Sequence, residues 1–270
     1  MEHVAEPAPD LPAGSGTAAF FDLDNTIIRG ASAFHLAVGL RRRGFFGTWD
    51  LITFAFHQSR YLMFGEDLRQ IEQVRARALS IVAGRSVAEI AAVGEEIWDE
   101  VLSLRIFPGT QALLTEHLDA GHQVWIITAS PVEIGELIGR RLGVTGALGT
   151  VAEHVDGFYT GRMIGDMLHG QAKARAVRQL AQEQGLDLSR CYAYGDSTND
   201  VPILSSVGHP VAINPDGRLR RRARAVGWPV REFRGRRRVA ARRSMHAASF
   251  AGLAWVVGLV WRSVRRALRP

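Results

Sequence analysis

The stretch Phe20-Phe21-Asp22-Leu23-Asp24-Asn25-Thr26 places two carboxylates at the end of a short apolar run. The run, Ala18–Phe21, does not alternate between polar and apolar residues, as expected of a parallel strand that is buried on both faces. Asp22 follows this strand directly, and Asp24 stands two residues further on. The stretch therefore predicts a buried strand with a pair of acidic side chains at its carboxyl end.

Three more apolar runs end abruptly in polar residues, and helical patterns separate them. The predicted strands are Val124–Ile127, Cys191–Tyr194 and Val211–Ile213, and the predicted helices are Gly109–Ala120, Val132–Leu142 and Gln171–Gln184. Alternating strands and helices predict an α/β fold with a doubly wound, Rossmann-like parallel sheet. Ligands of such sheets bind beyond the carboxyl ends of the strands, so the polar residues that end these strands are expected to meet in one crevice.

The stretch 32–105 interrupts this alternation because it contains no good strand candidate. It predicts four helices, at Phe34–Arg42, Trp49–Phe64, Gly65–Val82 and Ser86–Leu104. These helices would form an all-helical cap inserted into the core, and Pro108-Gly109 would open the next core helix. The predicted catalytic core is then 18–31 and 106–233, flanked by a disordered N-terminus (1–17) and a C-terminal tail (234–270).

Asp22 and Asp24 have the spacing that phosphoryl transfer through a carboxylate needs. A carboxylate that attacks phosphorus in line forms an acyl-phosphate. Since two anions then face each other, a cation is needed, and Mg²⁺ prefers one or two carboxylates together with phosphate oxygen and water. A second carboxylate can protonate the leaving alkoxide and later deprotonate water. We therefore predict Asp22 as the nucleophile, Asp24 as the general acid/base and Mg²⁺ as the cofactor.

Residues at other strand and helix ends supply the remaining groups. Thr128 follows the second strand and offers a hydroxyl and a backbone N–H to phosphoryl oxygens. Lys173 is the only lysine in a chain with 32 arginines, which suggests that a compact point charge is needed there. In Gly195-Asp196-Ser197-Thr198-Asn199-Asp200, Asp196 is predicted to bind the metal directly. Asp200 would bind it through water or orient Lys173.

The sequence resembles the haloacid dehalogenase superfamily, specifically its phosphoserine phosphatase-like branch. The resemblance is carried by four motifs in order: the first is Asp22–Thr26, the second Thr128, the third Lys173 and the fourth Gly195–Asp200. The resemblance spans roughly Ala18–Trp228 and includes Asp156-Gly157-Phe158-Tyr159-Thr160-Gly161-Arg162. It implies a phosphatase in which Asp22 is the nucleophile. An aspartate at position 24, which the dehalogenases of the family lack, favours reactions of phosphate esters. The resemblance implies these roles for the motif residues: Asp22, the Asp24 carbonyl and Asp196 bind Mg²⁺; Thr128, Lys173 and Asn199 hold the phosphoryl group; Asp200 supports the site.

Three departures from the phosphoserine phosphatase pattern concern the substrate. The second motif continues as Ala129-Ser130-Pro131 rather than with two glycines, and the fourth contains Ser197-Thr198 rather than Gly-Ala. The cap stretch near Gly65-Glu66-Asp67-Leu68 fits poorly to the acidic–aromatic pair that grips the serine amine in that enzyme. Phosphoserine therefore does not follow as the substrate. Ser130 itself is expected to N-cap the next helix rather than to contact substrate.

The C-terminal tail is strongly basic. Arg218–Pro270 contains 16 arginines and one acid, Glu232, so it contributes +15 to a net charge of +6 and leaves −9 for the rest. The uncharged stretch Ser244–Trp261 is only marginally long enough to span a membrane. We expect a peripheral anchor in which arginines bind anionic headgroups and Trp255 and Trp261 lie at the interface. The alternatives are a helix packed on this chain or on a second copy and, third, nucleic-acid binding, for which the sequence has no recognition motif.

Compartment and function are constrained by two further features. The single cysteine, Cys191, excludes an internal disulfide and fits a reducing compartment, and 1–17 lacks the pattern of a signal peptide. We expect a cytoplasmic phosphatase for a small phosphomonoester, with peripheral attachment to the inner face of the cell membrane as an option. Two alternatives stay open: a membrane-associated lipid-phosphate phosphatase or phosphotransferase, and a non-catalytic regulatory protein on the same fold.

Overall fold

The structure is a computed structural model that describes residues 16–45, 79–80 and 82–234. By its internal contacts the chain divides into Met1–Arg231 and Glu232–Pro270, and the elements below belong to the first unit. The predicted helix Trp49–Phe64, most of Gly65–Val82, residues 1–15 of the N-terminal lead-in and the tail from 235 onward lie outside the described residues. The last two residues of the lead-in that was predicted as disordered are ordered, since Gly16 O and Thr17 O accept backbone hydrogen bonds from Asp187 and Gln123. Within the described residues, no helix has the length and apolar character needed to cross a membrane.

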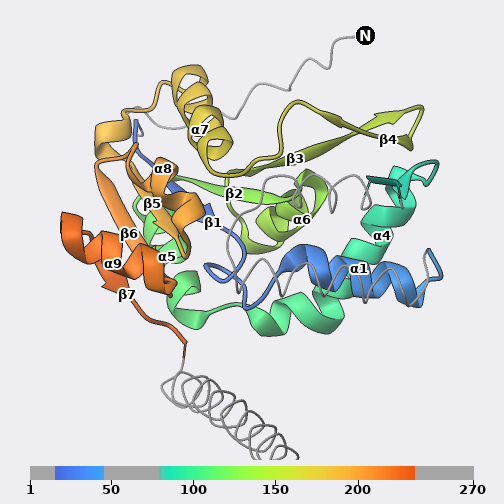
Figure 1. The fold of residues 1–270 in the computed structure, drawn as a ribbon, viewed down its shortest axis with the longest axis horizontal. Helices are drawn as coiled ribbons and strands as arrows, with labels where there is room; N and C mark the ends of the chain where they lie inside the picture. The colour runs from blue at the N-terminus through green and yellow to red at the C-terminus, as the bar shows by residue number, and fades with distance from the viewer. Residues whose placement is uncertain (1–15, 46–78, 81, 235–270) are drawn as a thin grey trace, which may run out of the picture. The chain divides into compact units, whose positions relative to one another are not determined.

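A seven-stranded sheet forms the centre of this unit (Figure 1), in the order β4-β3-β2-β1-β5-β6-β7. All neighbouring strands pair in parallel except β3 and β4. The predicted doubly wound α/β fold is confirmed. The strand bounds are β1 Ala18–Asp22, β2 Gln123–Pro131, β3 Gly146–Val155, β4 Phe158–Ile164, β5 Tyr192–Gly195, β6 His209–Ile213 and β7 Val230–Arg231.

Strand β1 lies in the middle of the sheet and is buried on both faces, as its uninterrupted apolar run predicts. Successive side chains of a strand point to opposite faces. Phe20 joins a core cluster with Val177 of helix α7 (Gln171–Glu183). Phe21 stacks on Tyr194 at a centroid distance of 4.2 Å, beside His117 of helix α5 (Pro108–Asp119). Helices therefore cover both faces of the sheet, and the hydrophobic effect fixes the position of Asp22 at its carboxyl end.

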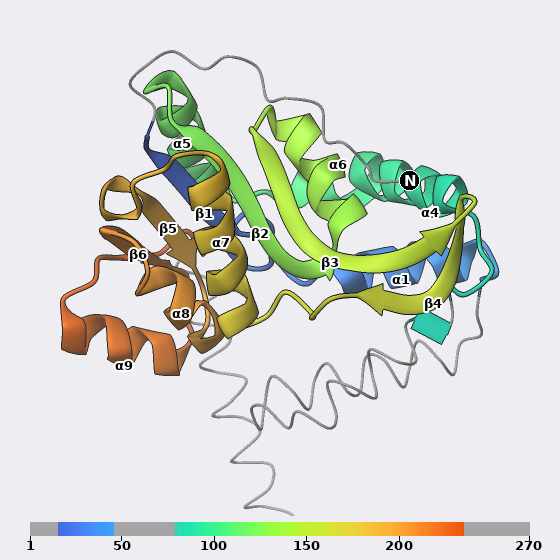
Figure 2. The same ribbon diagram turned by 90° about the horizontal axis from the view of Figure 1, so that it is seen from above.

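Among the described residues, five helices belong to the core, of which the first three match the predicted helices closely, whereas α8 and α9 were not predicted. They are α5 Pro108–Asp119, α6 Val132–Leu142, α7 Gln171–Glu183, α8 Val201–Leu204 and α9 Gly217–Val226. Val177 and Leu180 of α7, Ile203 of α8 and Leu219 of α9 all belong to the core cluster that contains Phe20. Figure 2 shows the unit from above, with α7 and α8 near β5 and with α6 beside β2 and β3.

A long β-hairpin, β3–β4, is absent from the strands predicted above. Val155 pairs with Phe158, so Asp156 and Gly157 alone form the turn. Their φ angles of 51° and 81° match the two-residue turn that favours Asp-Gly because both positions have positive φ. In both views the hairpin extends beyond the rest of the sheet toward helix α4 (Val87–Ile97) (Figures 1 and 2). There Tyr159 exchanges backbone hydrogen bonds with Gly84 and Arg85.

The described part of the cap consists of α1 Ser32–Arg42 and α4 Val87–Ile97, as two of the four predicted helices. The predicted helix Ser86–Leu104 is confirmed as an unbroken helical run from Val87 to Arg105, in which α4 is followed directly by a π-helical turn (Trp98–Leu102) and a 3-10 turn (Ser103–Arg105). Helices α1 and α4 approach closely at Gly39, where a Cβ would lie 2.4 Å from Ile97 Cδ1. This close approach holds the two cap helices together.

His117 links α5 to the sheet and makes folding stability depend on pH. Its Nε2 lies 2.8 Å from the Tyr194 hydroxyl and its Nδ1 lies 2.8 Å from His122 Nδ1. Burial, and then repulsion from His122, lower the pKa of His117 to about 4, so the fold favours neutral histidine. Its contribution to stability is complete above the unfolded value near 6.5 and is lost as the pH falls toward 4.

We expect the free energy of unfolding to fall by roughly 2–3 kcal/mol between pH 7 and pH 4 because of His117. His117→Gln keeps a polar side chain but does not titrate, so its stability should depend less on pH over this range. Urea unfolding of both proteins at several pH values measures the difference. Equal pH slopes in the two proteins would contradict this role of His117.

Candidate active site

The two carboxylates of the opening stretch directly precede a tight turn. Asp22 ends β1, and the chain then bends back through Asn25, whose φ is 61°. The turn is closed by backbone hydrogen bonds from Asn25 N to Ile28 O and from Ile28 N to Leu23 O. The amide of Asn214, beyond β6, donates to Asn25 O at 3.1 Å. Asp22 and Asp24 are therefore held by backbone geometry as well as by burial.

Lys173 joins Asp22 to the fourth motif. It lies in the first turn of α7 and is almost fully buried, and its Nζ lies 2.5 Å from Asp22 Oδ1 and 2.8 Å from Asp200 Oδ1. Burial by itself lowers the pKa of Lys173, but attraction to Asp200 and Asp22 outweighs it, so the pKa is raised. The ammonium group is therefore charged at neutral pH, and it lies at the nucleophile predicted from the sequence.

The surroundings of Asp22 disfavour the ionised form of its carboxyl group. Burial raises the pKa of this carboxyl to about 7, repulsion from Asp200 adds to the rise, and Lys173 opposes it. A nucleophilic carboxylate has to be ionised. A cation bound beside Asp22 would favour the ionised form, since an opposite charge a few ångströms away stabilises it.

Asp200 organises the turn that follows β5. Its Oδ1 accepts from Lys173, and its Oδ2 accepts from the backbone N–H groups of Asp196 and Ser197, both at 3.2 Å. Gly195 has to be glycine, because a Cβ there would lie 2.4 Å from the Cβ of Asp200. Both oxygens of Asp200 are thus engaged by donors, which favours orientation of Lys173 over metal ligation for this residue.

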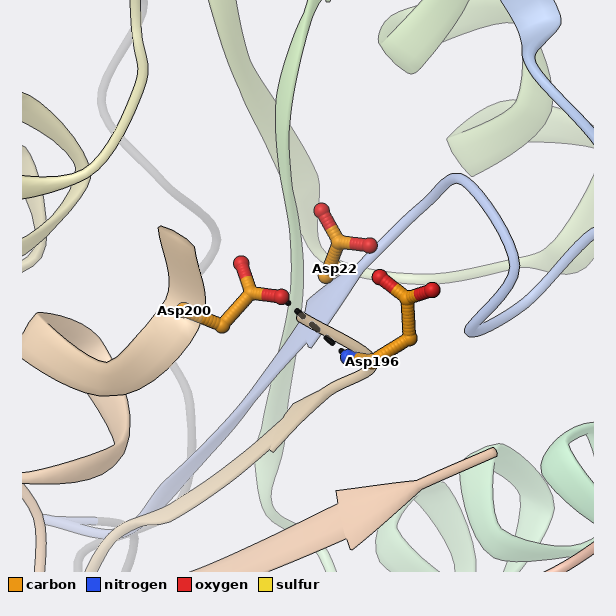
Figure 3. Close-up of side chains that lie close together, drawn as sticks. All are labelled: Asp22, Asp196 and Asp200. Atoms are coloured by element: carbon orange, nitrogen blue, oxygen red, sulfur yellow. Dashed lines mark hydrogen bonds between the residues drawn. The ribbon is translucent and has the colours of Figure 1, made fainter. Parts of the chain in front are cut away.

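Three carboxylates are close enough to share a cation. One oxygen each of Asp22, Asp196 and Asp200 lie within 4.8 Å of one another (Figure 3). Both oxygens of Asp200 accept hydrogen bonds, so a cation bound there would compete with these donors. Carboxylate oxygens are the donors that a hard divalent cation such as Mg²⁺ prefers, so the residues present fit the predicted metal.

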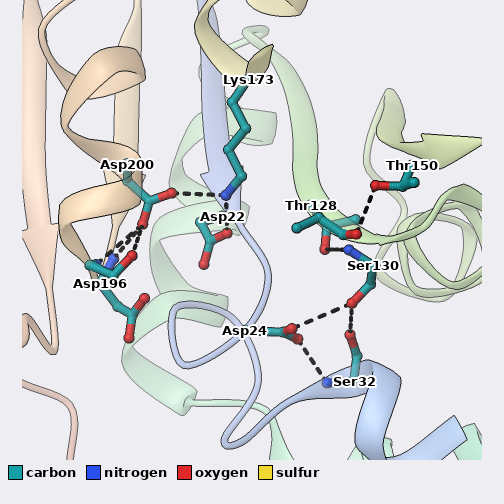
Figure 4. A network of polar contacts seen from close by, with 11 residues as sticks. Asp22, Asp24, Ser32, Thr128, Ser130, Thr150, Lys173, Asp196 and Asp200 are labelled. Carbon is teal, nitrogen blue, oxygen red and sulfur yellow. Dashed lines mark hydrogen bonds and ion pairs between the residues drawn. The ribbon is translucent and has the colours of Figure 1, made fainter. Parts of the chain in front are cut away.

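Thr128 follows the predicted second strand, but the observed strand β2 is longer and includes it. In Figure 4 it lies between Asp22 and Ser130. Its side chain is buried, and its Oγ1 accepts from the N–H of Ser130 at 3.0 Å. The hydroxyl proton is then available for a phosphoryl oxygen. Asn199 is half-buried on the short 3-10 turn that holds Asp200.

Asp24 contacts two serines, Ser32 and Ser130, and this contact was not predicted from the sequence. Its Oδ1 accepts from the N–H of Ser32 at 2.8 Å, and its Oδ2 lies 3.4 Å from Ser130 Oγ. Burial raises the pKa of Asp24, and these hydrogen bonds partly oppose the rise. The predicted N-cap role of Ser130 is wrong. Pro131 occupies the N-cap position of α6, and the Ser130 hydroxyl points to Asp24 and Ser32 instead (Figure 4).

The model of the haloacid dehalogenase-like hydrolases matches residues 19–205 of the chain. The chain belongs to this family. The match covers β1, the described cap helices and the strands and helices that carry Asp22, Thr128, Lys173 and Asp200. Together with the relatives named as phosphatases that follow, this match makes the chain a phosphomonoester hydrolase of the phosphoserine phosphatase-like type.

The chain is similar in sequence to two curated phosphatases and to one protein of solved structure. Phosphoserine phosphatase SerB1 of Mycobacterium tuberculosis is 52% identical over 246 residues, covering 88% of this chain and 80% of the relative. Histidinol-phosphatase of Neisseria meningitidis serogroup C is 31% identical, with 80% and 98% covered. A solved structure of a protein of unknown function from Bordetella pertussis Tohama I is 32% identical, covers 81% and 99%, and has a TM-score of 0.72.

Proposed function

We propose that this protein hydrolyses a small phosphomonoester with Mg²⁺ and through an aspartyl-phosphate on Asp22. The observation that carries the proposal is the position of Lys173 Nζ, 2.5 Å from Asp22 and 2.8 Å from Asp200 at the carboxyl end of the sheet. This arrangement supports a nucleophile whose approach to a phosphate dianion is assisted by a fixed positive charge.

Each group of the site has a role in the proposed reaction. An oxygen of Asp22 forms a bond to phosphorus while the bond from phosphorus to the ester oxygen breaks, and that oxygen takes a proton from Asp24. Water then attacks phosphorus, gives a proton to Asp24, and releases inorganic phosphate and the Asp22 carboxylate. Lys173 and Thr128 hold the phosphoryl oxygens during both steps.

Asp22, the Asp24 carbonyl and Asp196 are proposed to hold Mg²⁺. When bound, the cation would reduce the repulsion between the Asp22 carboxylate and the phosphate. We expect chelation of Mg²⁺ to lower hydrolysis of p-nitrophenyl phosphate at least about 100-fold, and added Mg²⁺ to restore it. Activity that survives chelation and dialysis unchanged would contradict a metal-dependent reaction.

A matched pair of variants tests the ligand set. Asp196→Asn should raise the Mg²⁺ concentration needed for half-maximal activity at least about tenfold, because a neutral amide replaces a charged ligand. Asp166→Asn changes an exposed carboxylate that pairs with Arg175, so it should leave the Mg²⁺ requirement unchanged. Magnesium titrations of hydrolysis measure both, and equal requirements in the two variants would exclude Asp196 as a ligand.

The similar proteins guide the choice of substrate. Two of them are named for phosphoserine and histidinol phosphate, which are both phosphate esters of primary alcohols that carry an amine. We therefore propose a small ester of this kind, in the cytoplasm. A panel that contains phosphoserine, histidinol phosphate and simple alkyl phosphates tests it, and equal kcat/KM for all members would contradict selection of an amine.

A lipid phosphate is the second candidate, and helix α9 favours it. Its charged side chains are all arginines, and Arg218, Arg221, Arg222 and Arg224 are exposed and form no ion pair with another described residue. Anionic membrane surfaces attract such clusters by about 1 kcal/mol per residue. Comparing phosphatidic acid in vesicles with soluble esters separates the two candidates, since a lipid phosphatase would prefer the vesicle-bound ester.

A further inference from the structure

Two buried serine hydroxyls meet between the cap and the core. Ser32 opens α1, the first helix of the cap, and Ser130 lies near the end of the core strand β2. Their Oγ atoms are 2.8 Å apart although 98 residues separate them in sequence, and both side chains are almost inaccessible to solvent. Asp24, the proposed acid/base, contacts both residues (Figure 4).

The hydrogen bonds distinguish the two oxygens of Asp24. The Ser32 N–H lies 2.8 Å from Oδ1. An N–H can only donate, so Oδ1 has to act as an acceptor. A proton on Oδ1 would make this oxygen a poorer acceptor and so weaken the hydrogen bond from the Ser32 N–H. When Asp24 is protonated, its proton is therefore favoured on Oδ2, which lies 3.4 Å from Ser130 Oγ.

Ser130 is well suited to face either protonation state of Oδ2. A hydroxyl donates one hydrogen bond and accepts others, so it can donate to an ionised Oδ2 while it accepts from Ser32. With Oδ2 protonated, it can donate to Ser32 instead. The N–H of Ser130 is fixed on Thr128 Oγ1 at 3.0 Å, so the hydroxyl can reorient without a movement of the backbone. Catalytic hydrogen bonds are often long before substrate binds and tighten afterwards.

Packing fixes the separation of the two serines. Helix α1 packs on α4 at Gly39 and Ile97. Helix α4 is joined to α6 by the ion pair of Glu95 and Arg141 at 2.6 Å, and α6 begins directly after Ser130 and Pro131. The contacts thus form a closed ring from Ser130 through α6, α4 and α1 back to Ser32. The described part of the cap holds Asp24 in a preset orientation.

We propose that Ser32 and Ser130 are positioning residues that make Oδ2 of Asp24 the oxygen that transfers the proton. This inference rests on the proposed function. As the bond from phosphorus to the ester oxygen breaks, that oxygen takes the proton of Oδ2, and the later attacking water returns a proton to Oδ2. Ser32 acts through its N–H on Oδ1, and Ser130 through its hydroxyl on Oδ2.

Dependence on the leaving group distinguishes positioning from a merely structural role. A poor alkoxide leaving group needs a proton in the first step, whereas p-nitrophenolate hardly does, and kcat/KM reports the steps up to its release. Ser130→Ala should lower kcat/KM about 10- to 100-fold for an alkyl phosphate but less than about threefold for p-nitrophenyl phosphate. The same variant should show a burst of p-nitrophenolate, because hydrolysis of the aspartyl-phosphate also needs Asp24.

The two functions of Ser32 can be separated by substitution. Ser32 is the first residue of α1 and follows the extended residue Ala31, so Ser32→Pro is compatible with the helix start but removes the N–H. It should produce the same leaving-group dependence as Ser130→Ala, whereas Ser32→Ala keeps the N–H and should have a smaller effect. Ser130→Thr restores the hydroxyl and should recover most of the alkyl-phosphate activity.

The experiment compares kcat/KM for p-nitrophenyl phosphate and alkyl phosphates across these variants, with urea unfolding as a check of the fold. Ser206→Ala is the matched control, because among the described residues the Ser206 hydroxyl donates to Ile203 O, in the turn after α8. A loss of the same size for both classes of ester in Ser130→Ala and Ser32→Pro, or no loss, would overturn the inference. An inactive wild-type protein would instead refute the proposed function, on which the inference rests.

Discussion

Asp22→Asn should lower hydrolysis of any phosphomonoester by at least about 10⁴-fold, the scale seen when an enzyme loses its nucleophile. The amide has nearly the shape of the carboxylate, but its nitrogen and oxygen do not attack phosphorus to give a stable acyl-phosphate. The substitution also removes a buried carboxyl whose pKa is raised to about 7. We therefore expect the folded state to be at least as stable as the wild type near pH 8.

Two controls make this result specific. Asp166→Asn alters an exposed carboxylate that pairs with Arg175 and should retain wild-type kcat. Urea unfolding should show that Asp22→Asn remains folded, so that lost activity cannot be attributed to lost structure. If Asp22→Asn kept activity within about tenfold of the wild type, Asp22 could not be the nucleophile.

Lys173→Met should abolish activity and also weaken the fold. The side chain has a similar length, but without the ammonium group the carboxyls of Asp22 and Asp200 face each other in a buried site. Removing one partner of a buried ion pair typically costs about 3–5 kcal/mol. We expect a decrease of about this size in the free energy of unfolding at pH 8, and a loss of kcat of at least about 10³-fold.

A double variant separates the two effects of Lys173. Asp200→Asn, combined with Lys173→Met, relieves the repulsion between carboxylates, so it should recover part of the stability but none of the activity. Arg175→Met, on the same helix, removes an exposed arginine and should change neither. Recovery of activity in the double variant would show that Lys173 serves the fold alone.

The sequence allowed the central strand and the motif residues to be predicted for a physical reason. A strand buried on both faces needs an unbroken apolar run, and Ala18–Phe21 is such a run within the strand Ala18–Asp22. Because parallel strands all present their carboxyl ends at one edge, Asp22, Thr128 and Asp196 were expected to come together. Figure 4 shows Asp22, Thr128, Lys173, Asp196 and Asp200 around this edge.

Other features depend on contacts that one sequence does not reveal. The Asp156-Gly157 turn is a recognisable hairpin signal, but its flanking strands do not alternate cleanly, so β3 and β4 were missed. The contact of Ser32 with Ser130 depends on the packing of α1, α4 and α6 rather than on local sequence. Ser130 also precedes a proline at the start of a helix, where a capping role is the usual expectation.

Isolation of the phosphoenzyme tests the central claim most directly. Wild-type protein would be mixed with Mg²⁺ and a phosphate-labelled ester, quenched in acid within the first turnover, and digested to locate the label. We predict that the label lies on the peptide that contains Asp22, is released by hydroxylamine as an acyl-phosphate is, and is absent from Asp22→Asn. Label on another residue, or rapid turnover with no labelled protein at any quench time, would contradict an aspartyl-phosphate on Asp22.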